Sequence, residues 1–368
     1  MQFFDHQANA RSRSRQLKIA FVLAAAATVL GLYGAMRAVL WVLGWPPPAL
    51  FTETTIGLGL LMVVGGWWIE SSNMRSGEEL ARRLGAREIR PDVSFAEKRL
   101  LNIVQEMAVA AHMPRPQVML QPRVKAINAF ATGWNQADWV IVVTEGALDW
   151  LTREELQALL AHEMSHLHEG DTRINMQLAG MVAGLEMLHN YGDMLRNFGK
   201  ADKVEQTPAV AVLAWVPGQV IMAVGWLGWM AGRLLQAAVA REREWLADAR
   251  AVQWTRSRDG LGGVLRKVMA QRRDTPAGYA ENPVHTGLAH PAVQHMLLVD
   301  VPGRSRMERW LDTHPTLDDR VQRVYGRRMQ PLPAAPVTAG HESARRDEGG
   351  SAGTVSIASP VDPFARFM

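Results

Sequence analysis

Residues 156–166 of the chain read LQALLAHEMSH and contain the pattern H-E-x-x-H at His162, Glu163 and His166. Two histidines four residues apart lie on the same face of a helix, where both imidazoles can bind one metal ion. The glutamate next to the first histidine can then reach a water molecule on that ion and act as a base. The stretch therefore predicts a zinc site on a helix, with Glu163 as the catalytic base.

The helix that carries this pattern has recognisable ends in the sequence. Thr152 can cap its N-terminus, and Glu155, three residues later, completes a capping box. Leucine and methionine side chains within residues 156–167 line one broad face, and Gly170 is a suitable stop. We therefore predict a capped amphipathic helix that buries one face against a core.

A zinc site with two histidines needs a third protein ligand. Residues 241–248 read REREWLAD and place Glu244 and Asp248 one helical turn apart on the same face. Glu244 can bind the metal from that face, while Asp248 can orient the imidazole of a ligand histidine. The residues thus predict one zinc ion per chain, with Glu244 added to the two histidines.

The composition excludes several other classes of protein. The chain has 368 residues, 48% of them hydrophobic, and contains no cysteine. A disulfide framework, a cysteine nucleophile and a thiolate metal site are therefore impossible. A formal net charge of +4 on a chain of this length gives no argument for a nucleic-acid partner, and we expect none.

Two apolar runs near the N-terminus predict a pair of membrane spans. Residues 19–36 contain no charged side chain, and the apolar run continues beyond Arg37, which makes it too long for the core of a signal peptide. A second run covers residues 54–69 and ends in Trp67 and Trp68, which favour the lipid interface. We therefore predict a membrane hairpin.

Basic residues flank this hairpin on both sides, whereas the connection between its spans, residues 45–53, has none. The positive-inside rule then places both flanks in the cytoplasm. Because the Arg- and Ala-rich composition is typical of bacteria, we expect a multi-pass protein of a bacterial inner membrane, embedded in the lipid bilayer, whose catalytic site faces the cytoplasm. The flanking residues are Arg11, Arg13, Arg15 and Lys18 before the first span and Arg75, Arg82, Arg83, Arg87 and Arg90 after the second.

Two further apolar segments lie between the predicted metal ligands. Residues 206–232 are uncharged throughout, whereas residues 174–195 are interrupted by charged side chains such as Glu186. The number of membrane crossings between His162 and Glu244 must be even, because all ligands have to meet on one side. Either both segments span, which the length of the uncharged run favours, or both form a reentrant or interfacial pair.

Short β-type runs at residues 117–120, 126–131 and 139–143 precede the H-E-x-x-H helix. The predicted fold class is an integral membrane protein, mainly α, with transmembrane helices and a cytoplasmic α+β catalytic domain of the zincin type that contains a small β-sheet. The predicted units are residues 1–18 (basic cytoplasmic N-terminus), 19–70 (transmembrane hairpin), 71–173 (catalytic domain, first part), 174–235 (second membrane-associated helical pair), 236–328 (catalytic domain, second part) and 329–368 (disordered tail).

Four stretches of the chain resemble the membrane-associated zinc peptidases that include the HtpX heat-shock protease, mitochondrial OMA-type proteases and CAAX prenyl endopeptidases. The stretches have the order and spacing of that family, and the resemblance covers about residues 15–325. They are Asn128-Ala129-Phe130-Ala131, LQALLAHEMSH at residues 156–166, REWLAD at residues 243–248 and THPTLDDR at residues 313–320.

The resemblance implies the same three metal ligands and the same base as the residues themselves. It also implies that an extended substrate pairs antiparallel with an edge strand, a mode in which main-chain hydrogen bonds supply affinity. The residues of that strand are Asn128, Ala129, Phe130 and Ala131.

His314, in the family-like T-H-P stretch, is a candidate for an additional hydrogen-bond donor to the oxyanion. The alternative is a buried histidine that is bonded to Asp248 or to the backbone. Both interpretations are open at the level of the sequence.

We expect an integral membrane zinc endopeptidase that hydrolyses polypeptide substrates, and the resemblance implies quality control of misfolded or damaged membrane proteins. One alternative is a processing protease for a lipidated or other specific membrane peptide, although the apolar segments are too few to enclose a chamber. Another is a non-catalytic membrane scaffold with a structural zinc site, but a structural site does not need the carboxylate of Glu163.

Overall fold

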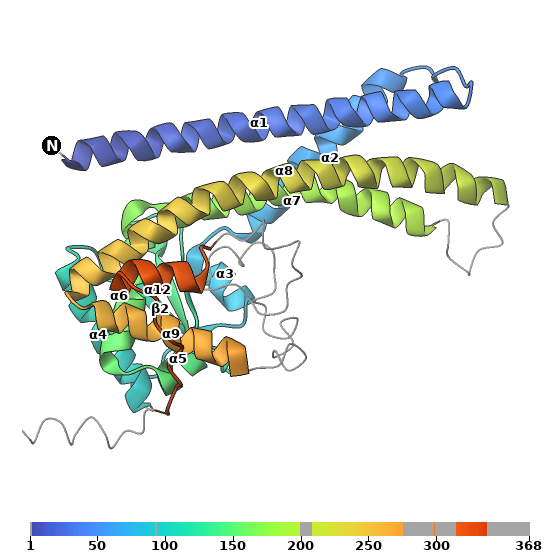
Figure 1. The fold of residues 1–368 in the computed structure, drawn as a ribbon. Coiled ribbons are helices and arrows are strands. Elements are labelled where there is room, and N and C mark those ends of the chain that lie inside the picture. The colour runs from blue at the N-terminus through green and yellow to red at the C-terminus, as the bar shows by residue number, and fades with distance from the viewer. Residues whose placement is uncertain (1, 93, 199–207, 275–297, 299–313, 337–368) are drawn as a thin grey trace, which may run out of the picture.

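The computed structural model describes residues 2–92, 94–198, 208–274, 298 and 314–336. A long arm of helices adjoins a globular part that contains a small sheet (Figure 1). The arm consists of α1, Gln2–Val42; α2, Phe51–Asn73; α7, Asp171–Phe198; and most of α8, Pro208–Thr255. The helices of the globular part are α3, Gly77–Arg83; α4, Phe95–Ala110; α5, Glu145–Trp150; α6, Arg153–Glu169; α9, Arg258–Asp274; and α12, Leu317–Tyr325.

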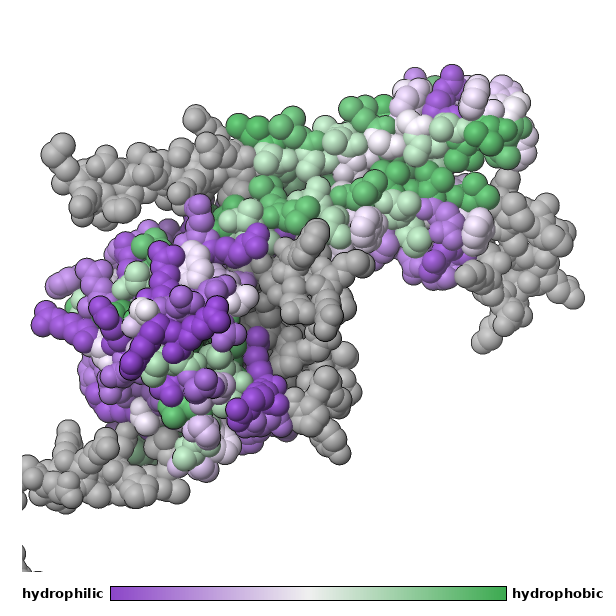
Figure 2. All heavy atoms as spheres, in the orientation of Figure 1, coloured by the Kyte–Doolittle hydropathy of each residue, from purple (hydrophilic) through white to green (hydrophobic). Residues whose placement is uncertain are grey.

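Among the residues that the structure describes, three helical segments are long and apolar enough to cross a membrane. They are Ile19–Val42 within α1, Phe51–Asn73 and Trp215–Thr255 within α8. Large apolar side chains on these helices stay exposed, among them Trp41 at 82% and Leu61 at 67%, and Figure 2 shows an apolar surface along the arm. Such a surface is stable in contact with lipid, so the chain is a membrane protein. The predicted fold class, long membrane helices with a small α+β domain, is confirmed.

Glycines set the distance between α7 and α8, which run antiparallel beside each other. A Cβ atom on Gly192 would lie 2.2 Å from the backbone nitrogen of Met222, and one on Gly225 would lie 2.4 Å from that of His189. The two backbones therefore touch where a side chain would separate them. α7 is not among the three candidate spans, and the even number of crossings between the metal ligands stays a prediction.

The sheet of the globular part has the strand order β1–β2–β4–β3. β2 pairs parallel with β4, whereas β3 pairs antiparallel with β4 and β1 with β2. The three β-type runs of the sequence correspond to β2, β3 and β4, and β3 lies at the edge of the sheet. The bounds are β1, Arg87–Glu88; β2, Gln117–Gln121; β3, Ala129–Thr132; and β4, Val140–Thr144, with a 3-10 helix, Gln136–Asp138, between the last two.

The H-E-x-x-H helix is α6, and its ends are those that the sequence predicts. Thr152 accepts a hydrogen bond from the backbone N–H of Glu155, whose carboxylate accepts one from the N–H of Thr152 at 2.8 Å. Gly170 ends the helix with a φ of 72°. The Glu155 carboxylate also pairs with Lys267 of α9 at 2.7 Å. α6 is buried along most of its length, so its metal-binding face is held rigidly within the core.

α8 runs without interruption from Pro208, inside the predicted apolar run, through Glu244 to Thr255. The sequence predicts a boundary at residue 235 because the composition changes there from apolar to charged. In the structure this change of composition falls inside one helix. The third predicted ligand therefore lies on a continuous extension of a membrane helix. Of the predicted disordered tail, residues 329–336 follow α12 without a helix or strand, and residues 337–368 lie outside the described residues.

Gly225→Ala should destabilise the protein in detergent by about 1–3 kcal/mol, because the added Cβ overpacks the contact between α7 and α8. Thermal unfolding followed by circular dichroism measures this effect. The control is Gly57→Ala in α2, where no heavy atom lies within 4 Å of the added Cβ, and where alanine raises helix propensity. Equal unfolding temperatures for the two variants would contradict the proposed backbone contact.

Candidate metal centre

Three side chains from two helices point at a common centre. His162 and His166 lie on α6 and Glu244 on α8, and their ligand atoms all lie within 4.8 Å of one another. Nε2 of His162 is 3.3 Å from Nε2 of His166 and 3.6 Å from Oε2 of Glu244. Nε2 of His166 is 3.4 Å from Oε1 of Glu244. The structure therefore brings together the three residues predicted as metal ligands.

The spacing of these atoms fits a small divalent ion. A tetrahedral ion with bonds of about 2.0–2.1 Å holds its ligand atoms about 3.4 Å apart, and the three observed separations are 3.3, 3.4 and 3.6 Å. Two imidazole nitrogens and a carboxylate oxygen are also a donor set that such ions bind. The residues present therefore fit a resident metal ion.

The Nδ1 atom of each ligand imidazole, which faces away from the common centre, contacts a carboxylate. Nδ1 of His162 lies 3.0 Å from Oδ1 of Asp248, one turn beyond Glu244 on α8. Nδ1 of His166 lies 3.0 Å from Oδ2 of Asp171 at the start of α7. Carboxylates in these positions orient the rings and select the tautomer that directs Nε2 at a metal. Asp248 was singled out from its spacing, whereas Asp171 belongs to no motif and was missed.

Arg320 of α12 joins two of the acidic side chains. Its Nε and Nη2 donate to the carboxylate of Asp248 at 2.9 and 2.7 Å, and its Nη1 lies 3.2 Å from Oε2 of Glu244. Burial alone would lower the pKa of this guanidinium, but the charges of Asp248 and Glu244 outweigh it and hold the pKa above its usual value. Arg320 therefore stays charged and compensates the buried carboxylates.

Arg243 links the carboxylate of Asp171 to the same network of ion pairs. It precedes Glu244 on α8 and forms an ion pair with Asp171. Because Asp171 also contacts His166, this pair links the start of α7 to both α6 and α8. Arg243 and Arg320 both lie within the stretches that resemble the peptidases, but nothing in the sequence assigned a contact to either.

Glu163 is buried beside the ligand cluster, with 1% of its surface exposed. Neither oxygen of its carboxylate has a hydrogen-bond partner within the described part of the chain. Burial raises the pKa of Glu163 to about 7. A buried carboxylate without a protein partner requires another polar group nearby, and water at a metal ion meets that requirement.

His314 lies at the edge of the cluster. Its Nδ1 is 3.2 Å from Oε2 of Glu244, and 7% of the residue is exposed. The structure thus places the imidazole against a predicted metal ligand, which neither of the two interpretations from the sequence had specified. Its role in the reaction stays a prediction.

The predicted substrate strand is β3 with the residue before it, Asn128. Ala129 and Ala131 of this strand pack in the same core as α6, whereas Phe130 points into the core on the other face of the sheet. The carbonyl oxygen of Ala129 accepts a hydrogen bond from the backbone N–H of Leu298 at 3.0 Å. The outer edge of β3 can therefore bond to a backbone from outside the sheet.

The chain has long helices with an exposed apolar surface and, next to them, a buried ligand set of two histidines and a glutamate. These features together define a membrane-bound metallopeptidase. The model of Peptidase family M48 matches residues 94–328, a range that contains the whole cluster. The chain belongs to peptidase family M48, with its metal site at His162, His166 and Glu244.

Relatives of the chain are proteins named Protease HtpX homolog. The one from Desulfatibacillum aliphaticivorans is 33% identical over 248 residues, which are 67% of this chain and 73% of the relative. The one from Lactobacillus acidophilus is 33% identical over 236 residues, 61% of this chain and 72% of the relative. The one from Syntrophobacter fumaroxidans is 30% identical over 271 residues, 73% of this chain and 86% of the relative. No solved structure matches the chain significantly. The predicted family is confirmed.

Asp248→Asn should weaken metal binding about 10- to 100-fold, because an amide no longer supports the His162 imidazole as a carboxylate does. Titration of the metal-free protein with zinc against a chromophoric chelator measures this affinity. The control is Asp318→Asn, which changes an exposed carboxylate on α12. An Asp248 variant that binds zinc as tightly as the control would contradict the assigned role.

Proposed function

We propose that the chain is a zinc-dependent endopeptidase of a bacterial inner membrane that acts on misfolded or damaged membrane proteins. The single observation that carries the hydrolytic part is the carboxylate of Glu163, buried and without a described protein partner beside the metal ligands. Zinc is supported by the donor set of two imidazoles and one carboxylate and by the spacing of their atoms. Quality control is supported by the resemblance to the family of the HtpX heat-shock protease.

The side chains around the centre have different roles in peptide hydrolysis. An ion bound by His162, His166 and Glu244 supplies Lewis-acid activation of water and of the scissile carbonyl. Glu163 accepts the proton of the attacking water and returns it to the leaving nitrogen. Burial disfavours the charged form of this carboxylate and so favours its acceptance of the proton. His314 donates a hydrogen bond to the oxyanion, and its contact with Glu244 keeps the imidazole at the centre.

The substrate pairs in extended form with the outer edge of β3. The position of β3 at the edge of the sheet and the hydrogen bond from Leu298 to Ala129 support this arrangement. Within the stretch Asn128, Ala129, Phe130 and Ala131, the main-chain groups of Ala129 and Ala131 face the outer edge, because alternate residues bond to β4. α6 packs against the same strand. The scissile bond is thereby carried past Glu163.

Glu163→Gln should lower casein hydrolysis by detergent-purified protein about 10²- to 10⁴-fold, because the amide cannot accept the proton. Its zinc content should stay near one ion per chain. Glu244→Ala should lose both activity and zinc, because it removes a ligand. Casein cleavage and metal content, measured by mass spectrometry on the same samples, test the proposal.

The matched control is Glu154→Gln, which changes an exposed carboxylate on the same helix as Glu163. This variant should cleave casein at the wild-type rate and retain zinc. Full activity in Glu163→Gln would remove the proposed base. Retention of zinc by Glu244→Ala would show that the third ligand is a different residue.

The catalytic site should face the cytoplasm, because both basic flanks of the first hairpin are expected on that side. The chain has no cysteine, so single cysteines are clean labels. In intact spheroplasts, a membrane-impermeant maleimide should react with Pro48→Cys between the first two spans. Asp92→Cys in the globular part should react with the maleimide only after the spheroplasts are lysed. The reverse pattern would place the site outside.

A further inference from the structure

The strand β3 has a fixed direction relative to the membrane arm. At its C-terminal end, a Cβ atom on Gly77 would lie 3.1 Å from the carbonyl oxygen of Thr132. Nε1 of Trp134, just beyond this end, donates a hydrogen bond to the carbonyl oxygen of Met74 at 2.6 Å. Met74 directly follows α2, a candidate membrane span that ends at Asn73. The C-terminal end of β3 therefore lies beside the end of that span.

α7 connects the same end of β3 to the arm. Oγ1 of Thr172, in the first turn of α7, donates a hydrogen bond to the carbonyl oxygen of Gly133 at 2.9 Å. Further along α7, a Cβ atom on Gly180 would lie 2.7 Å from Oγ of Ser71 in α2. The start of α7 and the end of α2 thus both lie at the C-terminal end of β3.

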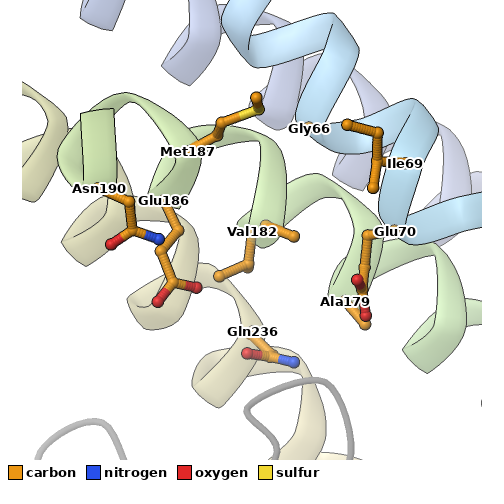
Figure 3. A pocket seen from close by; sticks show the side chains of 10 residues that line it. Gly66, Ile69, Glu70, Ala179, Val182, Glu186, Met187, Asn190 and Gln236 are labelled. Atoms are coloured by element: carbon orange, nitrogen blue, oxygen red, sulfur yellow. The ribbon is translucent and has the colours of Figure 1, made fainter. Parts of the chain in front are cut away.

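α2 and α7 stay together as they run from β3 into the arm. With α8 they enclose a cavity of about 380 Å³, whose lining includes Glu70 of α2 and Ala179 of α7. Figure 3 shows these two residues at one end of the cavity and Met187 of α7 at the other. A Cβ atom on Gly66 of α2 would lie 3.0 Å from Cβ of Met187. The two helices therefore lead from the interior of the arm to the end of β3.

The N-terminal end of β3 points away from the arm. Just before it, the backbone N–H of Ile127 donates a hydrogen bond to Oε1 of Gln271 in α9 at 2.9 Å. The backbone N–H of Gly146 in α5 donates to the carbonyl oxygen of Val124 at 2.8 Å. α5 lies on the side of the globular part that is turned away from the arm (Figure 1). The chain therefore runs toward the membrane as it passes along β3.

A substrate that pairs antiparallel with β3 must run the other way. Its residues beside Thr132 come first in its own chain, and those beside Asn128 follow. The N-terminal side of a bound substrate therefore lies at the membrane end of β3, and its C-terminal side points away from the membrane. A membrane-anchored chain enters this arrangement directly only if its transmembrane helix precedes the cleaved segment.

We propose that the protein selects membrane substrates in which the cleaved segment follows a transmembrane helix, and that it cuts this segment close to the helix. The inference rests on the proposed function and specifies its substrate class. A segment that precedes its transmembrane helix has to pass the full length of β3 and turn back before it can pair in the same direction. Such a segment is cut only at a greater distance from the helix.

The geometry of α2 and β3 gives both distances. Trp68, at the expected lipid interface, precedes Met74 by six residues, which is about 9 Å along a helix. From Thr132 back to Ala129, the strand adds about 10 Å. An extended substrate covers both lengths with about six residues. A segment that arrives from the other direction needs about twelve residues, because it also has to form a turn and return.

Single-pass substrates, reconstituted with the protein in nanodiscs, test these distances. Each carries the same casein-derived segment either after or before the same transmembrane helix, separated from it by a Gly/Ser spacer of stepwise increasing length. Mass spectrometry of the products locates the cleaved bond. Its shortest distance from the helix should be about six residues when the segment follows the helix and about twelve when the segment precedes it. Equal shortest distances, or the reverse order, would overturn the proposal.

Disulfide cross-linking tests the direction of the bound chain without a membrane anchor and without cleavage. The chain has no cysteine of its own, so Glu163→Gln protein is given a single cysteine at an exposed position beyond one end of β3. These variants are Gln136→Cys at the membrane end and Lys125→Cys at the other end. A soluble casein-derived peptide with an N-terminal cysteine should cross-link about tenfold more to Gln136→Cys than to Lys125→Cys, because pairing concentrates its cysteine at that end.

A peptide with a C-terminal cysteine should show the opposite preference. The matched control is Asn102→Cys, an exposed position on α4, which should cross-link to neither peptide. An exchanged preference, or the same preference for both peptides, would contradict the assigned direction.

Casein cleavage by the wild-type protein separates this inference from the proposed function. A protein that cleaves casein but shows equal shortest distances is a peptidase without the proposed selection. A protein that shows the predicted cross-linking but never cleaves casein binds chains in the predicted direction and lacks the proposed function.

Discussion

The metal centre depends on the contact between α6 and α8, because His162 and His166 come from one helix and Glu244 from the other. Between these helices the chain runs outward along the arm in α7 and returns in α8. The close backbone contact of α7 with α8 fixes the register of that return and so determines where Glu244 arrives. Any change that shifts α8 along its axis would move the third ligand relative to the two imidazoles. The membrane arm is thus part of the framework of the active site.

Buried charge is the second constraint. Asp248, Asp171 and Glu244 bring negative charge into the core around α6, and Arg320 and Arg243 compensate it through direct ion pairs. Each of these pairs joins different helices, so the network ties α7, α8 and α12 to the metal ligands. Buried ion pairs contribute little net stability but break expensively when one partner is lost. The network is therefore better understood as a device that positions ligands than as a source of stability.

Features that depend on local sequence were predictable. The H-E-x-x-H pattern, the cap at Thr152 and the stop at Gly170 each need a few consecutive residues, and the helix has those ends. Glu244 and Asp248 followed from their spacing on one helix face. The contacts of Arg320 with Asp248 and of Arg243 with Asp171 were not predictable, because each joins segments far apart in the chain. The contact of Asp171 with His166, five residues earlier, was missed because it crosses the turn between α6 and α7 and no motif marks it. The cavity between α2, α7 and α8 was also missed, since it arises from the packing of three helices whose sequences separately suggest lipid contact or amphipathic faces.

The coordination of the metal in the purified protein tests the central claim most directly. X-ray absorption at the zinc edge reports the number, type and distance of the atoms bound to the ion. The account predicts four nitrogen or oxygen neighbours at about 2.0–2.1 Å, with the multiple-scattering signal of two imidazoles. A spectrum with six oxygen neighbours, or with one imidazole, would contradict a centre built from His162, His166 and Glu244.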